Sequence, residues 1–142
     1  MFTIDASVWI AAFQPQDLHH APSARWLEAI LEKEATVHSP VIVILETACA
    51  IARLTRNATR GREAAKKLET FPNLRLEALS NTLLQESMKQ GTSKMLRSAD
   101  ALYAATAYRT QSKLISWDNE HIQRANAQTP SDSLKQLARN LY

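Results

Sequence analysis

Short apolar segments alternate with helix-like segments along the sequence, and this alternation constrains the fold more than any other feature. Strands are predicted at 2–4, 35–39, 74–79 and 113–117, with a short edge strand at 127–129. Helices are predicted at 7–13, from 22 onward, and at 41–56, 62–71, 81–90, 99–109, 120–125 and 130–140. Strands that alternate with helices build a parallel sheet that helices cover on both faces. The pattern therefore predicts an α/β fold around a mostly parallel sheet of four to five strands.

Length and composition predict one globular domain over residues 1–142. A chain of this length, 45% hydrophobic, builds a core without disulfides or metal staples. Its single cysteine, Cys49, lies in an apolar helical pattern, and we expect a small core residue in a reducing compartment. No signal peptide is recognisable, and no apolar run is long enough to cross a membrane. We therefore expect a cytoplasmic protein.

Basic residues gather in a predicted helical hairpin at about 41–71, in a chain of formal net charge +3. They are Arg53, Arg56, Arg60, Arg62, Lys66 and Lys67. Such a cluster is explained equally well by a solvated charged surface, by contacts with nucleic-acid phosphates, or by the docking of a partner protein. The sequence leaves the three explanations open.

Two aspartates each come directly after a predicted strand. Asp5 follows the first strand and Asp118 the last main strand. Ligands of open parallel sheets bind at the carboxyl edge, and the ends of neighbouring strands lie about 4.8 Å apart. If these strands are neighbours, the two carboxylates can share one ion. Each aspartate is also well placed merely to cap the helix that follows it.

Two further acids lie on helices that can cover the same edge. Glu46 has Ile42, Cys49 and Ala50 as helical neighbours, and a glutamate on an apolar surface is rarely buried without a partner. Arg53 is the structural candidate for that partner. Asp100 lies in the first turn of an alanine-rich helix, where an acid also simply suits the helix dipole.

Clustered carboxylates repel one another, and a divalent cation is their simplest stabiliser. Oxygen ligands favour Mg²⁺ or Mn²⁺ over Zn²⁺, and such an ion activates water and stabilises the charge of a phosphodiester under attack. The histidines show no metal-ligand spacing and are predicted at the surface or in loops: His19, His20, His38 and His121. With Gly61 and Gly91 as the only glycines, the chain has no phosphate-cradling loop.

Four segments carry these acids in a fixed order. They are Ile4-Asp5-Ala6-Ser7, Leu45-Glu46, the run from Arg97 to Ala107 around Asp100, and Leu114-Ile115-Ser116-Trp117-Asp118. The ordered set resembles the PIN domain family, and most closely the small VapC-type toxins of bacterial and archaeal toxin–antitoxin pairs. The resemblance extends over nearly the whole chain, with Ser116 at a position where the family often has threonine.

The resemblance implies a three-layer α/β/α sandwich and a Mg²⁺- or Mn²⁺-dependent endoribonuclease. The catalytic and metal-binding residues it implies are Asp5, Glu46, Asp100 and Asp118, with Ser7 and Ser116 as supporting hydroxyls and Arg53, Arg56 and Arg60 as candidate contacts with RNA or a partner. It also implies a homodimer, held inactive by a cognate antitoxin. Dimer and antitoxin contacts would then compete with RNA for the hairpin.

Two other functions are compatible with these residues. One is a PIN-like module that binds RNA or protein without catalysis. The other is a phospho-receiver with Asp5 as acceptor, which is disfavoured because the first strand supplies a single acid. If the acids hold a metal, Asp5→Asn should abolish turnover. It should also raise the stability of the metal-free protein by relieving carboxylate repulsion.

Overall fold

The sheet consists of four parallel strands. A computed structural model describes residues 1–139, which place β1 at Phe2–Ile4, β2 at Val37–Pro40, β3 at Leu74–Glu77 and β4 at Lys113–Ile115. The strand order is β3-β2-β1-β4. In the β1–β4 pair, Ile4 lies opposite Ile115, so the two strands followed by Asp5 and Asp118 are neighbours, as a shared ion would require. The predicted edge strand at 127–129 is reduced to one bridge between Gln128 and Ile115.

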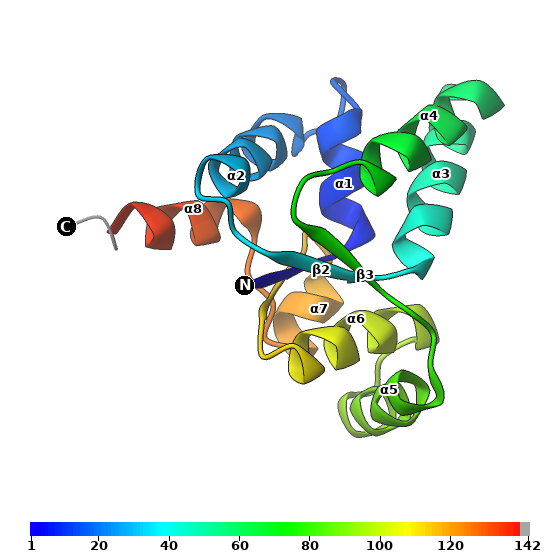
Figure 1. Ribbon diagram of the computed structural model, residues 1–142, viewed down its shortest axis with the longest axis vertical. Coiled ribbons are helices and arrows are strands. Elements are labelled where there is room, and N and C mark those ends of the chain that lie inside the picture. The colour runs from blue at the N-terminus through cyan, green and yellow to red at the C-terminus, as the bar shows by residue number, and fades with distance from the viewer. Residues whose placement is uncertain (140–142) are drawn as a thin grey trace.

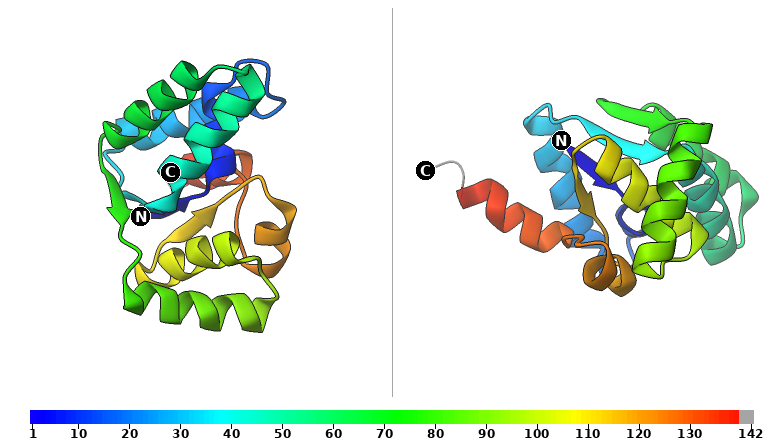
Figure 2. Two further views of the ribbon diagram at one scale, coloured as in Figure 1. Left: turned by 90° about the vertical axis from the view of Figure 1, so that its right-hand side faces the viewer. Right: turned by 90° about the horizontal axis from the view of Figure 1, so that it is seen from below.

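Helices cover both faces of the sheet. They are α1 (Ala6–Phe13), α2 (His20–Glu32), α3 (Ile42–Thr55), α4 (Ala58–Glu69), α5 (Asn81–Lys94), α6 (Ser98–Arg109), α7 (Asn119–Arg124) and α8 (Pro130–Arg139). Figure 1 shows α1 to α4 on one side and α5 to α7 on the other. Helix α6 lies on the strands and α5 packs on its outer side (Figure 2). The predicted three-layer α/β/α fold is confirmed.

Apolar strand residues and two tryptophans make the core. Ile4 of β1 and Ile115 of β4 are fully buried, as are Trp9 of α1 and Trp26 of α2. Burying one large aliphatic side chain stabilises a fold by about 1.5–3 kcal/mol. The indole N–H of Trp26 donates to Oγ of Ser133, 2.9 Å away, and so joins α8 to α2. The core thereby holds β1 and β4 in register at the edge where Asp5 emerges.

Two predicted helix boundaries, at Gly61 and Gly91, are wrong because each glycine lies inside a helix and does not end it. Helix α4 begins at Ala58 rather than at residue 62, and Gly61 lies inside it. A methyl group at Gly61 would lie 2.5 Å from the carbonyl oxygen of Ala48 and 2.8 Å from Cβ of Ala52, so the glycine permits close packing of α4 on α3. Helix α5 likewise continues through Gly91 to Lys94.

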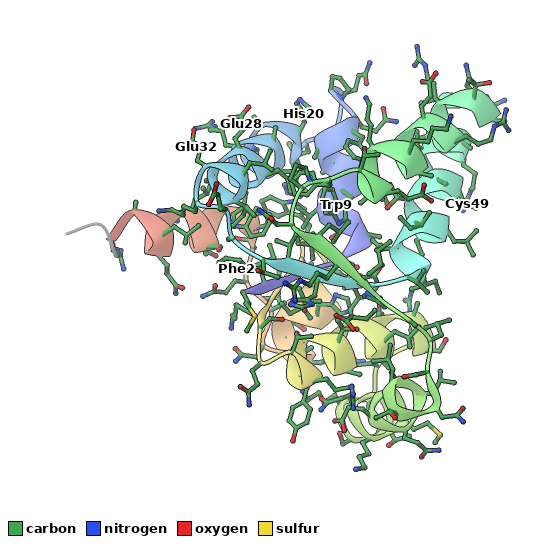
Figure 3. The ribbon with its side chains drawn as sticks, viewed as in Figure 1. Phe2, Trp9, His20, Glu28, Glu32 and Cys49 are labelled. Atoms are coloured by element: carbon green, nitrogen blue, oxygen red, sulfur yellow. The ribbon has the colours of Figure 1, made fainter. Side chains whose placement is uncertain are left out.

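Three other expectations need correction or limits. Cys49 is exposed rather than buried, on the outer side of α3 (Figure 3). Helix α6 begins at Ser98, one residue before its predicted start at 99, and Arg97 rather than a serine occupies its N-cap position. The predicted end of the last helix, at residue 140, lies outside the described residues. Among helices within 1–139, none combines the length and apolar character that a membrane crossing needs.

Candidate active site

Asp5 lies at the carboxyl end of β1 and is 6% exposed. It occupies the N-cap position of α1, yet its side chain makes no capping hydrogen bond. The hydroxyls of Ser7 and Ser116 instead both donate to its Oδ2, each over 2.7 Å. The backbone N–H of Trp117 donates to Ser7 Oγ and that of Asp118 donates to Ser116 Oγ, so each hydroxyl is held as a donor towards Asp5. The capping explanation of Asp5 is therefore wrong.

His121 lies at the centre of the acid cluster, and its predicted surface position is wrong. Helix α7 brings the imidazole beneath the edge of the sheet, where it has no exposed surface. Its Nδ1 lies 3.2 Å from Ser116 Oγ and 3.6 Å from Asp5 Oδ2. Its Nε2 lies 3.2 Å from Asp100 Oδ1. One ring thus separates the carboxylates of Asp5 and Asp100.

Glu46 and Asp100 approach this ring from helices on opposite faces of the sheet. Asp100 is in the first turn of α6, with its side chain 18% exposed. Glu46 of α3 accepts a hydrogen bond of 2.7 Å from the hydroxyl of Tyr103, which is fully buried. Arg53, the partner considered from the sequence, is exposed. Tyr103 therefore joins α3 to α6 across the end of the sheet.

Asp118 is exposed and caps α7. Its carboxylate accepts a hydrogen bond of 2.7 Å from the backbone N–H of Glu120. Its charge nevertheless contributes to the raised pKa of Asp100. Two arginines flank Glu120 at this rim, with Arg97 Nε 3.9 Å and Arg124 Nη1 3.5 Å from its carboxylate oxygens. Asp118 is thus close enough to raise the pKa of Asp100, while its own side chain caps the first turn of α7.

The charges of Asp5 and His121 stabilise each other. Burial opposes the charged form of Asp5, but contact with His121 and the hydroxyls of Ser116 and Ser7 outweighs burial and lowers the pKa of Asp5. Burial also opposes the charged form of His121, but Asp5 and Asp100 outweigh it and raise the pKa of His121. Each member of the buried pair therefore favours the charged form of the other.

The surroundings of Glu46 and Asp100 disfavour their charges. Burial is the main cause that raises the pKa of Glu46, and the charges of Asp5 and Asp100 add to it despite the hydrogen bond from Tyr103. Burial likewise raises the pKa of Asp100, and Asp118 and Asp5 add to it. Burial also raises the pKa of Tyr103 far above its usual range, so its hydroxyl remains a donor. The cluster therefore carries negative charge that its own residues do not fully compensate.

The donor set suits a divalent cation, although the ligands are not fully gathered. Within the described part of the chain, no three acidic, cysteine or histidine side chains converge closely enough to form a finished metal site. Glu46 and Asp100 are nevertheless carboxylates whose charge a cation would stabilise. Nε2 of His121 is buried and makes no hydrogen bond with any described residue. Oxygen ligands of this kind fit Mg²⁺ or Mn²⁺.

Sequence reasoning missed two members of the cluster, His121 and Tyr103. Both lie three residues after an acid that was identified, since His121 follows Asp118 and Tyr103 follows Asp100. Residues three apart on a helix share a face. This spacing was the available signal, and it places both side chains on the helix surface that bears the acid.

The basic residues of the hairpin lie away from the acid cluster. Arg53, Arg56 and Arg60 are exposed near the junction of α3 and α4. Arg56 follows Glu46 by ten residues, about 15 Å along a helix. Arg60 and Lys67 help to line a cavity of about 380 Å³ beside Phe13 at the end of α1. The candidate site therefore has an acidic centre and a separate basic region.

Comparison with solved structures shows the same fold in three prokaryotic proteins. VapC20 from Mycobacterium tuberculosis, described as a sarcin-ricin loop cleaving toxin, is 18% identical with a TM-score of 0.68, over 84% of this chain and 91% of its own. PAE2754 from Pyrobaculum aerophilum is 20% identical with a TM-score of 0.69, over 97% of this chain and 95% of its own. VapBC2 from Rickettsia felis, bound to a DNA fragment from its promoter, is 13% identical with a TM-score of 0.68, over 89% of this chain and 94% of its own.

The sequence itself identifies the family. No curated protein matches the chain significantly. The family model of the PIN domain, however, matches residues 2–127. This match contains both strands that meet at Asp5 and all the helices that bring side chains to the cluster. The chain belongs to the PIN domain family.

Proposed function

We propose that this protein is a divalent-metal-dependent endoribonuclease that acts on RNA phosphodiesters. One observation carries the proposal: three carboxylates, one directly after β1 and the others on α3 and α6, surround His121 at the carboxyl edge of a parallel sheet in a PIN domain. The charges of Asp5 and Asp100 add to the raised pKa of Glu46, the charge of Asp5 adds to that of Asp100, and Asp118 lies at the rim. The charges of Glu46 and Asp100 are disfavoured where they stand, and a bound cation is their simplest stabiliser.

Asp5, Glu46, Asp100 and Asp118 are the residues that would hold Mg²⁺ or Mn²⁺. When bound, the ion supplies activation of water and stabilisation of charge on the phosphate. Ser7 and Ser116 fix Asp5, because both hydroxyls donate to the same carboxylate oxygen. The hydroxyl of Tyr103 orients Glu46 from the opposite side. These contacts hold the side chains of the site before substrate arrives, which lowers the cost of organising it.

We further propose that the protein is the toxin of a cytoplasmic toxin–antitoxin pair, a homodimer that a cognate antitoxin inhibits. Support comes from the similar folds, since one is described as a loop-cleaving toxin and another as a VapBC2 complex bound to promoter DNA. Another similar structure, from Klebsiella pneumoniae, is a toxin–antitoxin complex. On this proposal, Arg53, Arg56 and Arg60 contact RNA or the antitoxin.

Cleavage of total cellular RNA tests the proposal. The purified protein is incubated with RNA in Mg²⁺, in Mn²⁺ and in EDTA, beside Asp5→Asn and the control Asp132→Asn. Asp132 is an exposed residue of α8 that pairs with Lys135 and lies outside the cluster. We expect discrete fragments that need the metal, persist in the control and disappear in Asp5→Asn. Cleavage that survives both EDTA and Asp5→Asn would contradict this site assignment.

The alternative is a PIN-like module that binds RNA or protein without cleaving it. It predicts RNA binding that neither metal nor Asp5→Asn alters, and no fragments under any condition. Binding and cleavage measured on the same protein preparations therefore separate the two functions.

A further inference from the structure

We propose that His121 is a direct nitrogen ligand of the metal ion and that it gives this site a preference for Mn²⁺ over Mg²⁺. The inference rests on the proposed metal-dependent function and adds a ligand to its acidic set. It starts from an unusual position: a fully buried imidazole stands between two carboxylates, and the ring nitrogen on the Asp100 side has no hydrogen-bond partner among the described residues.

The hydrogen bonds at Ser116 determine which ring nitrogen carries a proton in the neutral imidazole. The hydroxyl proton of Ser116 is directed at Asp5, 2.7 Å away. Towards Nδ1 of His121, at 3.2 Å, Ser116 Oγ is therefore an acceptor, and Nδ1 must be the donor. With the proton on Nδ1, the lone pair of neutral His121 lies on Nε2. Metal-binding histidines are prepared in this way, by a hydrogen bond at the other ring nitrogen.

Nε2 then faces a position where only a cation is favourable. Asp100 Oδ1 lies 3.2 Å from Nε2, but the geometry is not that of a hydrogen bond. In the metal-free protein the acids favour a proton on Nε2 at this position, and a bound metal ion would take the place of that proton. Glu46 adds negative charge from α3 and is itself disfavoured by the charge of Asp100. A metal ion at this position would bind Nε2 and Asp100 together, and its charge would stabilise that of Glu46.

An imidazole ligand changes which metal the site selects. Mg²⁺ strongly prefers oxygen ligands and retains its waters, whereas Mn²⁺ accepts carboxylate and imidazole together. Carboxylate ligands suit both ions, so the imidazole is the ligand that favours Mn²⁺. The proposal therefore predicts tighter binding of Mn²⁺ than of Mg²⁺, and a loss of that difference when the ring nitrogen is removed.

Pulsed electron paramagnetic resonance of Mn²⁺ bound to the wild-type protein tests the ligand directly. A coordinated imidazole produces modulation of the Mn²⁺ spin echo by ¹⁴N, which changes when the protein carries ¹⁵N-labelled histidine. The labelling needs no substitution, so it does not depend on any variant folding. We expect the modulation in wild-type protein and its change on labelling.

Two substitutions identify the histidine and the nitrogen. His121→Asn retains a donor near the Nδ1 position for Ser116 and removes Nε2, while His38→Asn alters a different buried histidine, which contacts Glu77. Loss of residues that merely orient ligands weakens metal binding about 10–100-fold, so His121→Asn should weaken Mn²⁺ binding at least about tenfold and Mg²⁺ binding much less. His38→Asn should leave the ¹⁴N modulation unchanged.

The outcomes separate this inference from the proposed function. Mn²⁺ that binds without ¹⁴N modulation overturns the role of His121, and metal-dependent RNA cleavage lost in Asp5→Asn would still support the nuclease. Modulation that persists in a folded His121→Asn also overturns it. Failure of the wild-type protein to bind either ion overturns both proposals.

Discussion

At the scale of single residues, the four acids are electrostatically unequal. Asp5 is buried but accepts two hydroxyl hydrogen bonds and lies beside His121, so its charge is stabilised. Glu46 and Asp100 are more accessible, yet their charges are disfavoured. The expectation that Asp5→Asn relieves repulsion and raises stability is therefore reversed. Relief of repulsion is expected instead when the charge of Glu46 or Asp100 is removed.

Substitutions of these acids should change stability in opposite directions. In EDTA at neutral pH, Asp5→Asn should lower the free energy of unfolding by about 1–3 kcal/mol, because it weakens buried charge-assisted hydrogen bonds. Glu46→Gln retains an acceptor for Tyr103 and removes a disfavoured charge, so it should raise that free energy. Urea denaturation of both variants beside wild type gives the comparison. A stabilised Asp5→Asn would contradict the assigned electrostatics.

The raised pKa of His121 predicts how the stability of EDTA-treated protein depends on pH. A group whose pKa is raised on folding contributes stability that is fully present below its unfolded value, 6.5 for histidine, and lost as pH rises through its folded value. The lowered pKa of Asp5 makes its contribution present above 3.8 and lost as pH falls further. Urea midpoints should therefore decline above about pH 6.5 in wild type. His121→Asn should flatten that decline, and an equal decline in both proteins would rule out His121 as its source.

At the scale of elements, the close packing of α3 and α4 depends on Gly61. A glycine within a helix normally costs about 1 kcal/mol relative to alanine, so Gly61→Ala would ordinarily stabilise. Here the added methyl group would lie 2.5 Å from the Ala48 carbonyl oxygen and force the helices apart. We expect Gly61→Ala to destabilise by about 1–3 kcal/mol, as overpacking does. Thermal unfolding measures this, and a raised midpoint would show that the helices separate without cost.

Some elements could be predicted from local sequence, whereas others depend on how the elements pack together. The β1 and β4 segments are short apolar runs bounded by polar residues, and local pattern was sufficient to place them. The helix boundaries predicted at Gly61 and Gly91 are wrong because glycine often marks a turn. Here its missing side chain instead lets two helices pack closely. His121 was missed for a similar reason. Its partners Asp5 and Asp100 come from other elements, so its burial depends on how the elements assemble.

At the scale of the whole molecule, charge is divided between two regions. The acidic cluster occupies the edge of the sheet, and the basic residues occupy the junction of α3 and α4, about 15 Å away along α3. A cation at the cluster would attract one phosphate of an RNA strand, and the arginines would attract others further along it. Such a division favours a long polyanion over a small phosphate ester.

The salt dependence of RNA binding tests this division. In the Asp5→Asn background, which prevents cleavage, each lost phosphate contact should reduce the slope of log K against log salt by about 0.7 for single-stranded RNA. Arg56→Gln with Arg60→Gln should therefore reduce the slope by about 1.4 if both contact phosphates. Arg139→Gln removes one positive charge from the end of α8, on the opposite side of the molecule from the hairpin (Figure 1), and should have little effect. An unchanged slope in the double variant would assign the hairpin to protein partners, since RNA would then be held by the acidic site and its cation alone.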